Sequence, residues 1–203
     1  MLDELTTLAL NLRWGWEPRI RKVFETLNPE LWEETRHNPI AVLAKLGPEE
    51  VEAAAGRPEF GRLLDVARSA VQEHRERHPP FFDARAPLVI GYFSLEFGVV
   101  EALPIYSGGL GILAGDHLKA ANDLNLPLAG VGLLYRWGFG RQRITPEGNQ
   151  SEVYVENQPA PVPLRRVDQD GQPLVAQAPA GHETGDVRPW RADGGLWPAR
   201  LRR

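Results

Sequence analysis

The chain of 203 residues contains no cysteine, which excludes both a disulfide framework and a thiolate metal site. Lysine is also scarce, with only Lys22, Lys45 and Lys119 among 23 basic residues. No apolar run approaches the roughly 18 residues that a membrane helix needs. The N-terminal stretch MLDELTTLALNLRW is too acidic and too interrupted for a signal peptide. We therefore expect a soluble, cytoplasmic protein that does not bind membranes.

An excess of charge of one sign is absent as well, since the formal net charge is −4. This balance gives no electrostatic reason to expect nucleic acid or an anionic membrane as a partner. Hydrophobic residues at 42% and charged residues at 25% are ordinary for a globular protein. The chain is long enough to bury a core of its own.

Residues 1–80 carry the pattern of a small helical domain. Asn28-Pro29 and Asn38-Pro39 each place a capping side chain before a proline at the first helical position. Apolar residues from Phe60 to Val71 mark a further amphipathic helix, which Pro79-Pro80 would end. The pattern predicts a bundle of four or five short helices.

Residues 81–165 predict an α/β unit. LVIGYF (88–93) is a continuous apolar run, typical of a strand buried on both faces of a parallel sheet. A helix over 109–123 and a second strand over 127–135 follow, so the two strands should be parallel. Hairpins are expected further on, with turns at 146–149 and at Asp170-Gly171. Residues 166–203 then form a hairpin remnant and an irregular tail.

A glycine-rich turn, SGGLG (107–111), stands directly before the predicted helix. The N-terminus of a helix offers unpaired N–H groups to an anion, and glycine lets a ligand approach the backbone. A phosphate cradle is therefore one interpretation, and a sharp turn with close packing is the other. No Gly-Lys-Ser/Thr follows, which excludes a P-loop. Gly109-x-Gly111-x-x-Ala114 matches the dinucleotide pattern in letters, but more than a dozen residues separate it from Phe93.

Three blocks around this turn carry a more specific resemblance: YFSLEFG (92–98), EALPIYSGGLGILAGDHLKAANDL (101–124) and PLAGVGLLYRWGFGRQ (127–142). Together they resemble the N-terminal part of the bacterial-type α-glucan phosphorylases (glycogen, starch or maltodextrin phosphorylases). LTTLALNLRWGWEP and LWEETRHNPIAVLAKL resemble the tryptophan-rich helical domain of unknown function that precedes the catalytic body. The resemblance covers roughly residues 3–165. It implies part of the first Rossmann-like domain of a two-domain glycosyltransferase fold of the GT-B type.

The resemblance also implies which residues face the substrate. Gly108, Gly109, Leu110 and Gly111 would line the catalytic cleft, with the N–H groups of Gly109 and Leu110 as donors. Glu96 would support this loop or contact sugar hydroxyls, the alternative being a plain carboxylate at a strand end. The implied partners are an α-1,4-glucan or maltodextrin and phosphate. No oligomeric state is predicted.

The implied reaction is retaining phosphorolysis, in which glucan and phosphate give glucose 1-phosphate and a shortened glucan. In the family, pyridoxal phosphate takes part from a lysine in the C-terminal Rossmann-like domain. None of the three lysines here has that context, so we expect no complete catalytic site, no bound cofactor and an inactive chain. Two alternatives stay open: a glycogen or starch synthase-like enzyme using a nucleotide sugar, and a non-catalytic glucan-binding or interaction module.

Other residues with reactive or aromatic side chains are expected to have structural and not catalytic roles. Asp116 and His117 are adjacent on the predicted helix and cannot easily converge on one metal, so no metal site is expected. Lys119 is expected on a solvated helix face. Trp14, Trp16 and Trp32 are expected in the core of the bundle and not as stacking platforms for sugars.

The C-terminal stretch from Arg188 is rich in Arg, Pro, Gly, Ala and Trp, and no strand pattern is found there. Our hypothesis is a truncated phosphorylase product that ends in out-of-frame sequence after about residue 180. A genuine short protein with a basic tail is the alternative. Two parallel strands alone would leave an open sheet edge and uncovered apolar faces, so we expect poor solubility or low thermal cooperativity.

Overall fold

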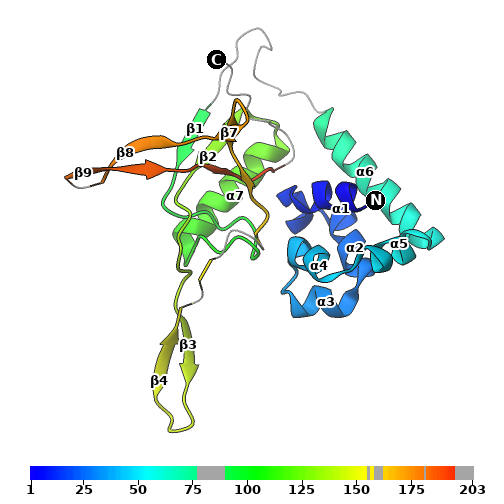
Figure 1. The fold of residues 1–203 in the computed structure, drawn as a ribbon, viewed down its shortest axis with the longest axis horizontal. Coiled ribbons are helices and arrows are strands. Elements are labelled where there is room, and N and C mark those ends of the chain that lie inside the picture. Colours follow the sequence, from blue (N-terminus) through cyan, green and yellow to red (C-terminus); the bar gives the residue numbers. More distant parts are fainter. Residues whose placement is uncertain (77–89, 155, 158–161, 181, 195–203) are drawn as a thin grey trace.

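The computed structural model describes residues 1–76, 90–154, 156–157, 162–180 and 182–194, and Figure 1 shows their arrangement. A helical domain is followed by a two-stranded parallel sheet with one helix, and then by β-hairpins. No helix in these ranges is long and apolar enough to span a membrane. The helices are α1 (Leu2–Ala9), the 3-10 helix η1 (Leu12–Gly15), α2 (Pro18–Leu27), α3 (Pro29–Glu34), α4 (Pro39–Lys45), α5 (Pro48–Ala55), α6 (Pro58–Arg75) and α7 (Gly109–Asp123).

Prolines set the starts of five successive helices, α2 to α6, each of which has proline at its first position. The Asn28 side chain accepts a hydrogen bond from the Leu31 N–H at 2.9 Å, as an N-cap does. The predicted starts at Asn28-Pro29 and Asn38-Pro39 are therefore confirmed. The prediction of four or five helices was too low, because further prolines begin helices that we had not separated. The expected stop at Pro79-Pro80 lies outside the described residues.

The core of the molecule lies in the helical domain. Phe24 and Phe60 are fully buried there, and α2 packs along α6. Three residues from beyond the predicted domain boundary belong to the same cluster, namely Val100, Ala102 and Leu103. The boundary at residue 80 stays a prediction, but the hydrophobic core extends past it.

The strand, helix and strand of the predicted crossover are present. Strands β1 (Ile90–Phe93) and β2 (Leu128–Val131) pair in parallel, and α7 connects them with the predicted bounds. The side chain of Leu118 on α7 lies against Gly130 of β2. Our expectation that the first strand is buried on both faces is wrong for the described residues, because Phe93 is 76% exposed. Helix α7 packs against β2, while Ile90 and Phe93 of β1 and Val131 of β2 are exposed to solvent.

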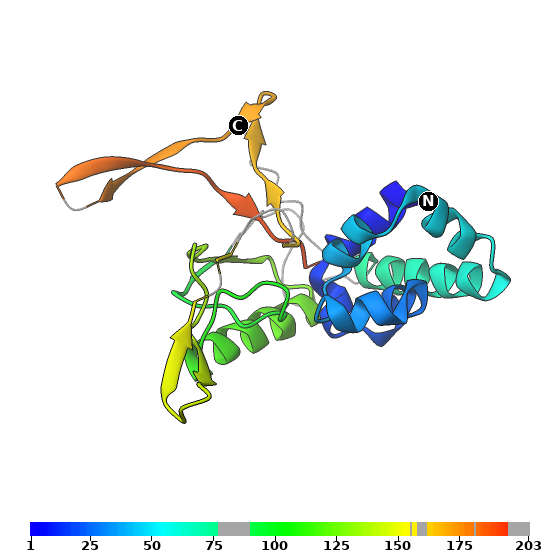
Figure 2. The same ribbon diagram turned by 60° about the horizontal axis from the view of Figure 1, so that its bottom comes forward.

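Hairpins follow the parallel sheet, and two of them project from the body in both views (Figures 1 and 2). Asp170 and Gly171 have φ of 52° and 78°, the backbone of a tight two-residue hairpin turn, as predicted there. We expected no strand after Arg188, which is wrong, since a short strand at 190–191 pairs with 165–166. The pairs are β3 (Arg141–Ile144) with β4 (Gln150–Val153), β6 (Asp168–Gln169) with β7 (Gln172–Pro173), β8 (Ala176–Ala180) with β9 (Glu183–Val187), and β5 (Arg165–Arg166) with β10 (Trp190–Arg191). The out-of-frame origin of the tail stays a prediction.

Candidate functional site

The glycine turn lies beside the carboxyl ends of the two parallel strands. Strand β1 ends at Phe93, and the following Ser94 N–H donates to the carbonyl oxygen of Val131, the last residue of β2, at 3.1 Å. Glu96 lies three residues after β1 and accepts hydrogen bonds from Ser107, the residue that precedes the glycines. These bonds connect the start of α7 to the carboxyl edge of the sheet. In open α/β sheets the carboxyl edge is the usual place for a ligand.

Glu96 holds the turn from its inner side. Its carboxylate accepts hydrogen bonds from the Ser107 hydroxyl at 2.8 Å and from the Ser107 N–H at 3.2 Å. The Ser107 hydroxyl is the main cause that lowers the pKa of the Glu96 carboxyl, followed by backbone N–H groups of Ser107, Gly108 and Gly111. A negative charge therefore already lies at the N-terminus of α7, and it belongs to the protein.

The glycines of this segment divide into two kinds. A Cβ on Gly111 would lie 2.5 Å from the Cβ of Tyr106, and one on Gly115 would lie 2.1 Å from the carbonyl oxygen of Gly98. Close packing thus requires glycine at both positions. A Cβ on Gly108 or Gly109 would meet no atom of the described residues within 4 Å. Gly108 has an extended backbone with φ of −145°, so neither packing nor conformation requires glycine there.

All five residues proposed from the sequence meet at this point. Gly108, Gly109 and Leu110 form an exposed ridge, in which Leu110 is 59% exposed, while Gly111 and Glu96 lie behind it. The sequence analysis did not assign a role to Ser107, which links Glu96 to the loop. Its place directly before a glycine-rich helix start, where short hydroxyl side chains are favoured, was the available signal.

The remaining candidates behave mostly as structural residues. Trp14 and Trp32 are each 4% exposed and pack edge to face in the core, as predicted. The exposed His117 ring packs near Tyr92, and the described residues contain no cluster of three metal-ligating side chains. Lys119 departs from its expected solvated face, because its ammonium group lies 5.8 Å from the ring centre of Trp16.

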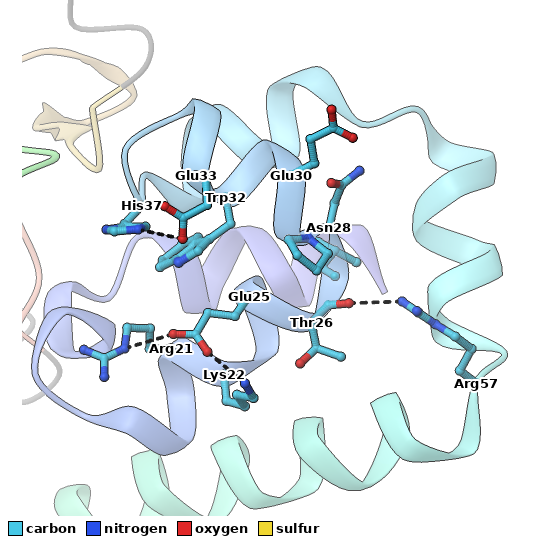
Figure 3. Close-up of a pocket in the computed structure, with 12 residues that line it drawn as sticks. Arg21, Lys22, Glu25, Thr26, Asn28, Glu30, Trp32, Glu33, His37 and Arg57 are labelled. Carbon is cyan, nitrogen blue, oxygen red and sulfur yellow. Dashed lines mark hydrogen bonds and ion pairs between the residues drawn. The ribbon is translucent and has the colours of Figure 1, made fainter.

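A separate hollow of about 1090 Å³ lies in the helical domain (Figure 3). Its walls come from residues 21–37 and from Arg57. Glu25 pairs with Arg21 at 3.3 Å and with Lys22 at 3.1 Å, and the Arg57 guanidinium donates to the Thr26 carbonyl oxygen at 3.3 Å. None of its lining residues belongs to the glycine loop, and its charges are already balanced, so we assign it no ligand.

Comparison with known families decides the kinship of the chain. A family model described as "Protein of unknown function (DUF3417)" matches residues 1–103 of the 203. The chain belongs to the DUF3417 family. The DUF3417 match covers the helical domain together with β1, Glu96 and the segment up to Leu103 that shares the domain's core.

Several relatives of this DUF3417 chain are named phosphorylases. It is 42% identical to the glycogen phosphorylase of Mycobacterium tuberculosis over 189 residues, which cover 89% of the chain and 22% of that protein. It is 35% identical over 182 residues to the maltodextrin phosphorylase of Thermococcus litoralis, covering 88% of the chain and 22% of that protein. The glycogen phosphorylase of Aquifex aeolicus is 37% identical over 172 residues, covering 84% of the chain and 24% of that protein. No solved structure gives a significant match.

These relatives confirm the resemblance to bacterial-type glycogen and maltodextrin phosphorylases. The DUF3417 chain spans about a fifth of the length of the relatives it matches.

Proposed function

We propose that this chain supplies one wall of the substrate cleft of an α-1,4-glucan phosphorylase with the two-domain GT-B fold. The exposed ridge of Gly108, Gly109 and Leu110 would face the glucosyl unit and the phosphate. The backbone N–H groups at the start of α7 would donate to oxygens of the substrate. Glu96 would keep the ridge in place from behind through Ser107.

One observation carries this proposal. Gly108 and Gly109 have open space where a Cβ would be, whereas Gly111 and Gly115 are packed tightly. Packing therefore explains why residues 111 and 115 are glycines. The close approach of a group outside the described residues would explain why Gly108 and Gly109 are glycines. A glucosyl unit placed against the backbone is such a partner.

Pyridoxal phosphate, which the family resemblance implies, does not match the lysines of this chain. Lys22 pairs with Glu25 at 3.1 Å, Lys45 pairs with Glu34, and Lys119 lies 3.8 Å from Asp116. Each amine is thus engaged with a carboxylate away from the glycine ridge. We propose that the chain alone does not catalyse phosphorolysis.

The test replaces the matching part of the Mycobacterium tuberculosis glycogen phosphorylase with this chain. The expected activity of the chimera is release of glucose 1-phosphate from maltodextrin and phosphate. Gly109→Ala should lower its kcat/KM by about a hundredfold, the effect of displacing a bound substrate by about 1 Å. Gly61→Ala is the matched control, because a Cβ at Gly61 also meets nothing within 4 Å, and it should leave activity unchanged.

Other outcomes would decide against the proposal. Use of ADP-glucose instead of glucose 1-phosphate as glucosyl donor would indicate a synthase. Binding of maltodextrin by the chain alone, with no change at the amides of 108–111, would indicate a binding module with a different site. Phosphorolysis by the 203-residue chain alone would refute its inactivity.

A further inference from the structure

The helical domain holds the end of α7 that lies opposite the glycine loop. Arg13, in η1, is 5% exposed, and its guanidinium donates to the Asp123 carboxylate at 3.3 Å. Asp123 is the last residue of α7 and its side chain is half exposed. Figure 2 shows α7 running up to the helical domain. A buried cation at the C-terminal end of a helix also interacts favourably with the helix dipole.

A histidine extends this contact. His74, near the end of α6, is 1% exposed, and its Nε2 lies 3.2 Å from the Asn122 side-chain oxygen. The same nitrogen lies 3.3 Å from the Arg13 guanidinium. Two helical elements, η1 and α6, thus hold the last two residues of α7 through polar groups that are buried on the side of the helical domain.

A second contact reaches the loop through the segment that carries Glu96. Val100 packs so closely on Gly15 of η1 that a Cβ there would lie 2.3 Å from its Cγ1. Two residues earlier in the chain, the Gly98 N–H donates to the Gly111 carbonyl at 2.7 Å. The segment from Glu96 to Val100 therefore lies against the helical domain at one end and against the start of α7 at the other.

We propose that the helical domain positions the glycine loop, and that Arg13 is a positioning residue for it. Arg13 fixes the end of α7 through Asp123, and the packing of Val100 on Gly15 fixes the segment that holds the loop through Glu96. The DUF3417 match ends at residue 103 and so contains both the helical domain and this segment. This coupling does not depend on which ligand the loop binds.

The test is hydrogen exchange, followed by NMR, on the whole 203-residue chain. Arg13→Gln should accelerate exchange of the Gly98 and Ile112 amides, which donate to the Gly111 and Gly108 carbonyls. The expected factor is about tenfold, as for one lost hydrogen bond to a charged group. Glu17, the N-cap of α2, also lies 3.8 Å from the Arg13 guanidinium, but it keeps its hydrogen bonds from Arg19, so the amides of α2 should change less than about twofold. Arg68→Gln is the control, because Arg68 pairs with Glu4 and Asp65 within the helical domain.

Asp123→Asn is the second variant, because its half-exposed side chain can be changed while the buried Arg13 guanidinium keeps Glu17 at 3.8 Å. It should accelerate the same two amides, and the double variant with Arg13→Gln should add nothing further. Unchanged exchange at Gly98 and Ile112 in Asp123→Asn would overturn the proposal. Equal acceleration in α2 and at the loop in Arg13→Gln would overturn it too, because Arg13 would then only stabilise the helical domain.

Discussion

Gly115 is the position where an added methyl group should perturb the site most directly. In Gly115→Ala the new Cβ would lie 2.1 Å from the Gly98 carbonyl oxygen and 2.5 Å from the Gly98 carbonyl carbon. Reaching 3.0 Å, the shortest distance that real Cβ atoms show, needs a shift of 0.9 Å (3.0 minus 2.1). The obstacle is backbone, so α7 and the segment at Gly98 must move apart. Overpacking of this kind costs about 3 kcal/mol, and the gain in helix propensity offsets about 1 kcal/mol.

The expected net effect is a loss of about 2 kcal/mol in the free energy of opening of α7. Hydrogen exchange of the α7 amides measures this quantity, and urea unfolding followed by circular dichroism measures the whole chain. Gly61→Ala in α6 is the matched control, because its Cβ meets nothing within 4 Å. It should stabilise its helix by about 0.5–1 kcal/mol. Equal protection of α7 in Gly115→Ala and in the wild type would refute the packing that we describe.

Three further predictions concern the loop, the helix starts and the surface. The pKa of Glu96 is lowered, so its hydrogen bonds from Ser107 are present above pH 4.5 and are lost as the pH falls through that lowered value. The protection factor of the Ser107 amide, its exchange rate relative to the unprotected rate at the same pH, should therefore fall there, but not in Glu96→Gln. Asn38→Ala removes the cap of the Ile40 N–H and should cost about 1 kcal/mol of unfolding free energy in urea, against no change for the exposed Glu52→Ala. Leu113→Gln, at a side chain that is 68% exposed, should raise solubility in a precipitation assay without lowering the melting temperature.

Local signals predicted the elements well. Proline at a first helical position locates α3 and α4, and the helix at Gly109–Asp123 has the predicted bounds. The predicted burial of β1 was wrong for a physical reason. A continuous apolar run indicates a strand covered on both faces, but that inference assumes layers on both sides, and Phe93 is 76% exposed.

Contacts between residues far apart in the chain could not be predicted from the sequence. The carboxylate of Glu96 reaches Ser107 across 11 positions, and that of Asp123 reaches Arg13 across 110. No periodicity or motif reports such a pairing, because each depends on how the helical domain, the segment at Gly98 and α7 pack together. The resemblance placed Glu96 near the loop, and the geometry adds that Ser107 is the group that it holds.

The position of Glu96 also changes what the loop can bind. The Ser107 hydroxyl and N–H, and then the backbone N–H groups of Gly108 and Gly111, lower the pKa of the Glu96 carboxyl, so a carboxylate already lies at the positive end of α7. A phosphate beside Gly109 would be repelled by this negative charge. We therefore expect the ridge to favour neutral sugar hydroxyls, and a phosphate bound beside it to need cations from another part of the cleft. Glu96→Gln should then raise the affinity of the loop for inorganic phosphate relative to its affinity for maltodextrin. An equal ratio of these two affinities in the wild type and in the variant would show that the carboxylate does not set this preference.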